Sequence, residues 1–299
     1  MASSSVENLA VSTGGTASNL KVENQEDNTV RGAECVAERN LSKEYALKLV
    51  AGFLTDSGES STSSSLYNGK APESGTLDWT MWQLLDSLFP TGGFAHSYGL
   101  EASVQAGSVY DSETLERFLL NSLQNNAALL LPFVFAGTRL PNTECWLQLN
   151  RLLNATLTNH VARRASLTQG TALLRTCGTV FTELPELKKM KLCVFKPVCT
   201  TPHHAPLFGV LCGLLGVSEL TAQRSYLFLA LRDILSAGTR LNITGPMEAA
   251  RLQRKVAFET ETLLGKYANK PLQQAHQTSP LVEIFQAGHD QLFSRMFCS

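Results

Sequence analysis

The 299-residue sequence lacks a concentration of charge of either sign. It carries 25 basic and 26 acidic residues, a formal net charge of -1 and a pI near 6.6. Proteins that bind nucleic acid usually present a concentrated basic face, so this balance argues against a nucleic-acid partner. With 43% hydrophobic residues the chain can still bury a substantial core, and we expect its partners to be proteins.

Long hydrophobic runs are also missing. The longest apolar runs, residues 127–137 and 205–217, fall short of the roughly 18 to 20 residues that cross a bilayer. The first residues have neither the apolar core of a secretory signal nor the Arg-rich composition of a transit peptide. We therefore expect no membrane span and a cytoplasmic location.

Closely spaced cysteine pairs are absent. The seven cysteines are scattered, odd in number and mostly in apolar surroundings, which is typical of reduced, buried thiols. No CxxC or HxxxH pair of the kind used by structural zinc sites occurs. Cys193, Cys199 and His203 lie close together in sequence, so a metal-binding carrier stays open as an alternative. Buried thiols are the preferred interpretation, with no metal or cofactor bound by the chain itself.

The common catalytic motifs are missing as well. The sequence has no GxxxxGK[ST] loop, no GxGxxG after a strand, no GxSxG elbow and no HExxH. His96 could act as a general base together with Ser97 and Glu101, which leaves a hydrolase-like enzyme as an alternative. A histidine that caps a helix or makes a structural hydrogen bond is the commoner case, and we expect no enzyme activity.

The residues that are present fall into two parts, of which residues 1–77 are the first. This part is rich in Ser, Thr, Gly, Asn and Glu, and its few large apolar side chains cannot offset the entropy of ordering. We predict a disordered extension. Within it, residues 41–54 carry apolar side chains at helical spacing, which indicates either a docking helix or a transient helix of no special role.

From Asp78 onward the helical period dominates, and alternating strand patterns are scarce. Asp78 is predicted to cap a first helix that ends at Pro90, and either Asp111 or Ser112 to cap a long apolar helix. Residues 185–202 are the least regular stretch. We predict that residues 78–299 form an all-α domain, a helical bundle of about ten helices.

Two apolar segments carry specific expectations. Gly209 and Gly213 stand in a helix that is apolar on all sides, so a neighbouring helix is expected to approach it closely. A final amphipathic helix, introduced by Pro280, is expected to include Phe293 and Phe297. These apolar groups near the end of the sequence must pack either in the domain's own core or on another subunit.

Residues 88–101, Leu-Phe-Pro-Thr-Gly-Gly-Phe-Ala-His-Ser-Tyr-Gly-Leu-Glu, form the stretch around which the domain is organised. Pro90 breaks the helical pattern, and Gly92 and Gly93 can take backbone angles closed to other residues. Phe94 and Tyr98 are expected to anchor this sharp corner on apolar surface. The polar groups that the corner brings to the meeting point of two helices are those of His96, Ser97 and Glu101.

Three arginines, Arg163, Arg164 and Arg240, lie near predicted helix ends. A guanidinium there can offer a bidentate fork to a carboxylate or a phosphate on a partner. Salt bridges within the domain are the simpler explanation.

The corner resembles the signature of the urease accessory protein UreF family, in which Leu-Pro or Phe-Pro precedes Gly-Gly-Phe, then an aromatic residue or His, Ser, and Gly-Leu-Glu. Three further stretches agree in the same order: Arg-Arg-Ala-Ser-Leu-Thr-Gln-Gly at 163–170, Arg-Leu-Asn-Ile-Thr-Gly-Pro at 240–246, and His-Asp-Gln-Leu-Phe-Ser-Arg-Met-Phe-Cys-Ser at 289–299. The last departs slightly, with Met296 in place of the commoner Leu. The resemblance covers about residues 78–299, and the long Ser-rich extension looks like that of plant members.

This resemblance implies an all-α, dimeric adaptor without catalytic activity of its own. UreF proteins bind UreD, also called UreH, and recruit the GTPase UreG for GTP-dependent nickel insertion into apo-urease. Nickel would then be handled by the complex. A GTPase-activating role, with Arg163, Arg164 or Arg240 stabilising phosphoryl-transfer charge, stays open as an alternative.

When the family's partner-binding regions are carried over by position, the terminal segment would face UreD/UreH. The Gly-Gly corner and the turn at 240–246 would shape the dimer and the surface that faces UreG. The candidate partner-binding residues are therefore Gly92, Gly93, Phe94, His96, Ser97, Glu101, Arg163, Arg164, Arg240, Phe285, His289, Arg295 and Phe297.

Overall fold

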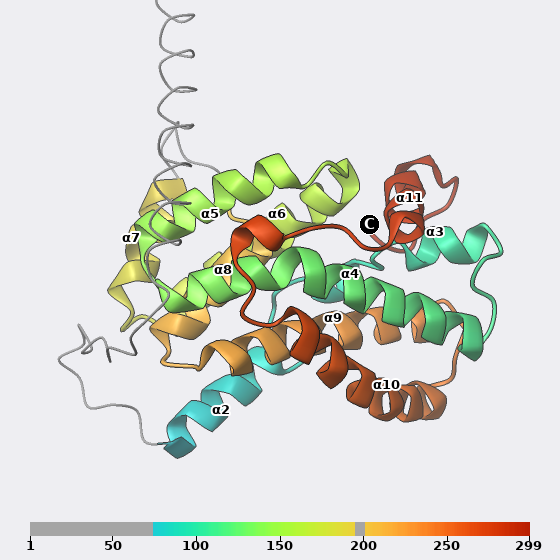
Figure 1. The fold of residues 1–299 in the computed structure, drawn as a ribbon, viewed down its shortest axis with the longest axis horizontal. Coiled ribbons are helices and arrows are strands. Elements are labelled where there is room, and N and C mark those ends of the chain that lie inside the picture. Colours follow the sequence, from blue (N-terminus) through green and yellow to red (C-terminus); the bar gives the residue numbers. More distant parts are fainter. Residues whose placement is uncertain (1–73, 195–200) are drawn as a thin grey trace, which may run out of the picture. The chain divides into compact units, whose positions relative to one another are not determined.

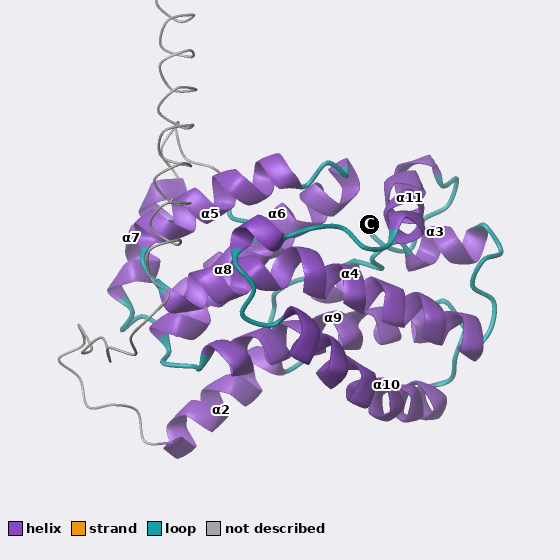
Figure 2. Cartoon of the chain, in the orientation of Figure 1, coloured by secondary structure: helices purple, strands orange, loops and turns teal. Residues whose placement is uncertain are grey.

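The computed structural model describes residues 74–194 and 201–299, and this part consists of ten α-helices and three short 3₁₀ turns joined by loops, without a strand (Figure 2). The predicted all-α fold is confirmed. The predicted helix at residues 41–54 lies outside the described residues, as does the predicted disordered extension up to residue 73.

The bundle is assembled from helices of 6 to 28 residues. The α-helices are, in chain order, α2 (Ser74–Leu85), α3 (Leu100–Gln105), α4 (Ser112–Arg139), α5 (Thr143–Thr156), α6 (His160–Val180), α7 (Pro185–Val194), α8 (His204–Leu214), α9 (Glu219–Arg240), α10 (Pro246–Tyr267) and α11 (Pro280–Gly288). The 3₁₀ turns are η1 (Gly93–Ala95), η2 (Leu272–Gln274) and η3 (His289–Gln291).

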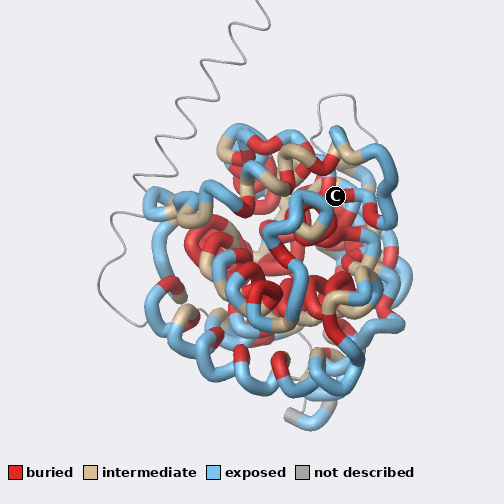
Figure 3. The backbone as a smooth tube through the Cα atoms, turned by 90° about the vertical axis from the view of Figure 1, so that its right-hand side faces the viewer, coloured by how far each residue is buried: buried red, intermediate tan, exposed pale blue. Residues whose placement is uncertain are grey.

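Helix α4 is the core of the bundle (Figure 1), where it packs against α8, α9 and α10. Leu115, Leu119 and Leu123 recur every fourth residue and are fully buried, as a helix facing the core requires. Among the described helices, α4 alone is long and apolar enough to cross a membrane, and 67% of its apolar window is buried by the rest of the chain. Buried positions gather in the interior and exposed ones on the outer turns (Figure 3).

The start of α4 follows the predicted cap. Asp111 accepts a hydrogen bond from the main-chain N–H of Thr114 (2.8 Å), and the Thr114 hydroxyl accepts one from the N–H of Asp111 (3.0 Å). This reciprocal capping box satisfies two amide donors that the first turn of a helix leaves without partners.

The predicted close contact of the glycine-containing helix is confirmed. A Cβ atom on Gly209 of α8 would overlap the carbonyl oxygen of Val134, and one on Gly213 would come within 2.5 Å of that of Thr138. Both carbonyls belong to α4, so α8 lies against the main chain of α4 without intervening side chains.

The predicted limits of the first helix are wrong at both ends. The chain is already helical at Ser74, so Asp78 lies inside α2 and does not cap it. At the other end α2 stops at Leu85, well before Pro90, because the Asp86 carboxylate accepts the N–H of Leu88 (2.8 Å) and turns the chain.

The prediction that residues 185–202 are irregular is wrong for the first ten of them, which form α7. Leu187 and Met190 are fully buried and lie one turn apart, so α7 is stabilised by packing against α6. Residues 195–200 lie outside the described part of the chain.

The end of the chain also differs from its prediction. Helix α11 ends at Gly288, so Phe293 and Phe297 do not belong to it. After η3 the chain continues as a non-helical segment, residues 292–299, which we call the terminal strap. The main-chain N–H groups of Met296, Phe297 and Cys298 find acceptors on the corner at residues 89–101 instead of on a preceding helical turn.

Candidate partner-binding site

The backbone of the corner has a shape that few residues other than glycine allow. Gly92 and Gly99 adopt left-handed angles, with φ of 77° and 86°. A Cβ atom on Gly93 would collide with the carboxylate of Asp233, and one on Gly99 would come within 2.8 Å of the main-chain nitrogen of Gln286. The glycines thus let the corner lie directly against α9 and α11.

Two arginines hold the corner on α9. Arg232 lies over the ring of Phe94 at 4.6 Å from its centroid and donates hydrogen bonds to the buried Asp233 carboxylate (2.8 and 3.0 Å). Burial raises the pKa of Asp233, while the neighbouring Arg232 opposes that shift. Arg240 donates a hydrogen bond to the carbonyl oxygen of Phe94 (2.6 Å). The position of Phe94 is therefore set by helix α9.

Glu101 binds the main chain of the terminal strap. Its carboxylate, in a residue only 3% exposed, accepts the N–H groups of Met296 (2.6 Å) and Phe297 (3.0 Å). The Nδ1 atom of the buried His289 lies 4.0 Å from the same carboxylate. Hydrogen bonds to a buried carboxylate are among the stronger ones in proteins, so Glu101 is the main polar anchor of the strap.

Ser97, His96 and Ala95 bind the last two residues. The N–H and the hydroxyl of Ser97 both donate to the main-chain oxygen of Ser299 (2.6 and 2.7 Å), and Nδ1 of His96 contacts the Ser299 hydroxyl (2.8 Å). The N–H of Cys298 donates to the carbonyl of Ala95 (2.7 Å). Burial lowers the pKa of His96 to about 4, so this imidazole is neutral at physiological pH.

The ring of Phe297 completes the domain's own core. It is buried among core side chains of α4, α9 and α10, and the Arg240 guanidinium lies 4.3 Å from its centroid. Its carbonyl is bonded to Nε2 of His289 (3.1 Å). Of the two alternatives for the apolar chain end, the core therefore accounts for Phe297, whereas Phe293 is fully exposed.

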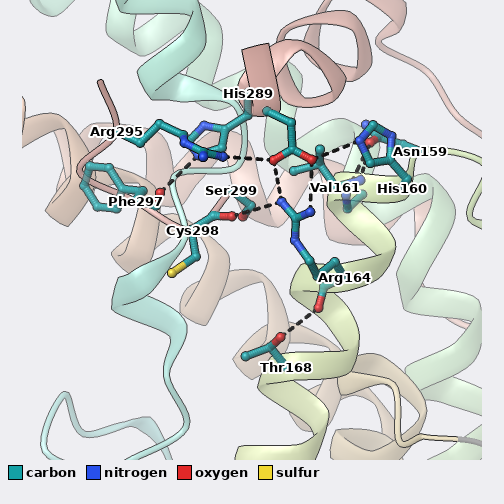
Figure 4. Close-up of polar contacts among 12 residues, drawn as sticks. Asn159, His160, Val161, Arg164, Thr168, His289, Arg295, Phe297, Cys298 and Ser299 are labelled. Carbon is teal, nitrogen blue, oxygen red and sulfur yellow. Dashed lines mark hydrogen bonds and ion pairs between the residues drawn. The ribbon is translucent and has the colours of Figure 1, made fainter. Parts of the chain in front are cut away.

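A cluster of charges surrounds Asp290, next to the strap. Arg164 binds the Asp290 carboxylate with two hydrogen bonds (2.7 and 2.9 Å), and His160 and Arg295 approach it at 3.1 and 3.2 Å (Figure 4). The hydrogen bond from Arg164 is the main reason that the pKa of Asp290 is lowered to about 2. A second contact joins Arg164 to the carbonyl of Cys298 at 3.5 Å (Figure 4).

Most of the sequence-predicted residues are thus brought together around the strap. Arg163 lies one position before Arg164 on α6, where its charge acts on His203, and Phe285 is half-buried on α11. Sequence reasoning missed Asp290, Asp233 and Arg232. Asp290 directly follows His289 in the motif at residues 289–299, and it could have been selected there as the acidic partner of the arginines.

Helix α11 and the strap expose apolar side chains near these charges. We call the set formed by Leu281, Ile284, Phe293 and Met296 the terminal apolar face, in which every side chain is more than half exposed. Apolar groups that lie exposed in one short segment are typical of a surface that a partner covers.

A second exposed apolar surface lies on α2. Trp79 and Trp82 are 71% and 58% exposed and meet edge to face with ring centroids 5.0 Å apart. They line a groove with Leu88 and with Arg175 and Val180 of α6. We call these five residues the tryptophan face.

The alternative of a metal-binding carrier depended on three residues. Cys199 lies outside the described residues, and Cys193 is partly exposed on α7. His203 is fully buried, with its main-chain N–H bonded to Asn150 (2.9 Å) and its Nδ1 to the Ser166 hydroxyl (3.0 Å). Within residues 74–194 and 201–299, no three His, Cys, Asp or Glu side chains converge as metal ligands would.

The alternative of a hydrolase-like site depended on His96, Ser97 and Glu101. His96 and Ser97 both bond Ser299, and Glu101 bonds the N–H groups of Met296 and Phe297. The geometry assigns them a common structural task, which is to hold residues 296–299.

Comparison with known proteins agrees with the resemblance seen in the sequence. A family model described as UreF matches residues 109–257. Urease accessory protein F of Arabidopsis thaliana is 52% identical over 228 residues, which cover 76% of this chain and 94% of the relative. The chain belongs to the UreF family.

Other UreF relatives extend the similarity to monocots and bacteria. Urease accessory protein F of Oryza sativa subsp. indica is 46% identical over 221 residues, covering 74% of this chain and 85% of the relative. The UreF of Arthrobacter sp. (strain FB24) is 30% identical over 230 residues, with 75% and 98% covered. The higher identity to the plant proteins confirms that this UreF is plant-like, and its general role is in urease maturation.

Proposed function

We propose that this chain is a non-catalytic adaptor that binds UreD/UreH and recruits the GTPase UreG, so that the complex inserts nickel into apo-urease in a GTP-dependent reaction. Nickel is then the cargo of the complex, and the chain needs no cofactor of its own. The free cysteines Cys145, Cys177 and Cys212 are buried, which favours a reducing compartment, and we place this assembly in the cytosol.

The observation that carries this proposal is the terminal apolar face. Phe293 is fully exposed although its neighbours in the strap are held by Glu101 and Ser97. A large aromatic side chain on a fixed main chain loses little entropy on binding and is a frequent anchor of protein interfaces. We assign this face, with Phe285 at its edge, to UreD/UreH.

We assign the charged cluster around Asp290 to the second partner, UreG. Arg295 is 45% exposed at its side chain and is oriented by Asp290, while Arg164 stands on the other side of the same carboxylate. Guanidinium groups fixed in this way can form bidentate bonds to a carboxylate on UreG. Arg240 is bonded to Phe94 and covers Phe297, which favours a structural role for it over that of a GTPase-activating finger.

The UreD/UreH assignment is tested by placing a charge on the terminal apolar face. We expect Phe293→Asp to weaken co-purification with UreD/UreH by about tenfold or more, because a buried unpaired carboxylate costs several kcal/mol. The matched control is Phe258→Asp, which changes another exposed phenylalanine, on α10. Equal binding by the two variants would exclude the terminal apolar face as the interface.

The tryptophan face supports the proposal of a homodimer. Two exposed indoles beside a groove form an apolar surface of the kind that partner subunits cover. We expect Trp79→Asp to shift the protein from dimer to monomer in sedimentation experiments, whereas Leu192→Asp, an exposed position on α7, leaves the mass unchanged. A Trp79→Asp protein that stays dimeric would place the dimer interface elsewhere.

A further inference from the structure

We propose that the corner at residues 89–101 is a peptide-binding site, and that the terminal strap is its ligand within the same chain. The ligand class is a short bent peptide that presents main-chain N–H and C=O groups and one aromatic side chain.

The first support for this site is the set of strap atoms that the corner recognises. Glu101 accepts main-chain N–H groups, Ala95 accepts a third, and Ser97 donates twice to a main-chain oxygen. From the end of α3, Gln105 donates to the carbonyl of Ser294 (2.8 Å). Recognition through main-chain groups gives a site affinity for a peptide, since those groups recur along any such ligand.

The last four side chains of the strap differ in burial. Phe297 and Ser299 are buried against the corner, whereas Met296 and Cys298 are exposed. The corner therefore holds Phe297 and Ser299, and the two side chains between and before them stay free.

The pocket for the aromatic side chain is built by the corner and the helices behind it. Arg240 is held by the carbonyl of Phe94 and lies over the ring of Phe297, while Leu100 at the start of α3 belongs to the core cluster that receives this ring. The main-chain bonds therefore supply affinity, and this pocket supplies specificity for an aromatic residue two positions before the last bound one.

Binding of the strap to the corner also determines which side chains the protein exposes to a partner. Phe293, Arg295 and Met296 belong to the same short segment as the residues that the corner binds, so their positions depend on whether the strap is bound. This consequence for partner binding rests on the proposed function, whereas occupation of the peptide site does not.

Hydrogen exchange of the full chain tests the polar anchor. We expect Glu101→Ala to accelerate exchange of the amides of residues 296–298 by about tenfold or more, because the charged acceptor of two of them is lost. Amides of α5 and α8 should keep their protection, which excludes general unfolding. The matched control, Glu259→Ala, removes an exposed carboxylate of α10 and should leave the strap unchanged.

Binding in trans tests whether the corner is a site in its own right. Phe297→Asp in the full chain removes the aromatic anchor, and we expect this variant to bind a fluorescent synthetic peptide of residues 289–299, detected by anisotropy. The double variant Glu101→Ala with Phe297→Asp should fail to bind it.

Two results would overturn the proposal. One is an unchanged exchange rate at residues 296–298 in both the Glu101→Ala and Phe297→Asp chains. The other is a Phe297→Asp chain whose strap exchanges rapidly but which takes up no peptide. Since UreD/UreH and UreG are absent from these experiments, the result is independent of the proposed function.

Discussion

At the scale of single residues, Gly93 is a position that leaves no room for a side chain. The atom that an added Cβ would meet belongs to Asp233, which is buried and bonded to Arg232. Arg232 is itself fixed by a hydrogen bond to the carbonyl of Leu85 (2.7 Å) and by the ring of Phe94. The neighbour cannot move aside without breaking a buried network, so the cost of a methyl group is high.

We therefore expect Gly93→Ala to lower the free energy of unfolding by about 1 to 3 kcal/mol, measured by urea denaturation. The control is Gly265→Ala on α10, where nothing lies within 4 Å of the added atom. There the substitution should stabilise by about 0.5 to 1 kcal/mol, because alanine is the better helix former. Effects of the same sign at the two positions would contradict the assigned contact with Asp233.

At the scale of elements, the two aspartates predicted as helix caps differ, because only one of them caps its helix. Asp111 precedes α4 and bonds the N–H of Thr114, whereas Asp78 is exposed inside α2. We expect Asp111→Ala to cost about 1 kcal/mol of stability in denaturant unfolding, as the loss of an N-cap does. Asp78→Ala should change stability by only a few tenths of a kcal/mol, and a comparable loss at both positions would show that capping is not the cause.

The same contrast shows how far the sequence predicts the fold. The Asp111 cap and the Gly209 contact follow from short-range patterns, and the structure confirms them. The first turn of α2 and the whole of α7 were missed, since tertiary packing can order segments whose local pattern is weak.

The terminal strap could not be predicted from local pattern at all. Phe293 and Phe297 fit the helical spacing begun at Leu281, but the N–H of Met296 is bonded to a carboxylate 195 residues earlier in the chain. A short terminal helix gains little by itself, so the buried acceptor decides the conformation. The residue types at the candidate site were visible in the sequence, whereas their common task of holding the strap was not.

At the scale of the whole molecule, three of the buried histidines make the stability of the bundle depend on pH. His96 binds the strap, while His203 and His204 stand at the start of α8, and burial lowers the pKa of each to about 4. An unfolded histidine takes up a proton near pH 6.5, but these three do not until the pH is much lower. The unfolded state therefore binds more protons between these two values, and stability must fall as the pH falls through that window.

We expect the urea midpoint to fall steadily from about pH 7 to pH 4.5, with each histidine contributing up to about 1.4 kcal/mol per pH unit below its unfolded pKa. Asp290 contributes little in this range, because its stabilising effect is lost only as the pH falls from its unfolded pKa of about 3.8 toward its lowered pKa of about 2. His203→Gln should reduce the slope by about one third if the three sites act independently. His276→Gln, at an exposed position in the loop before α11, should leave the slope unchanged. A midpoint that stays constant over this range would mean that the histidines are protonated in the folded protein, and that the strap and the start of α8 are more open to water than their burial indicates.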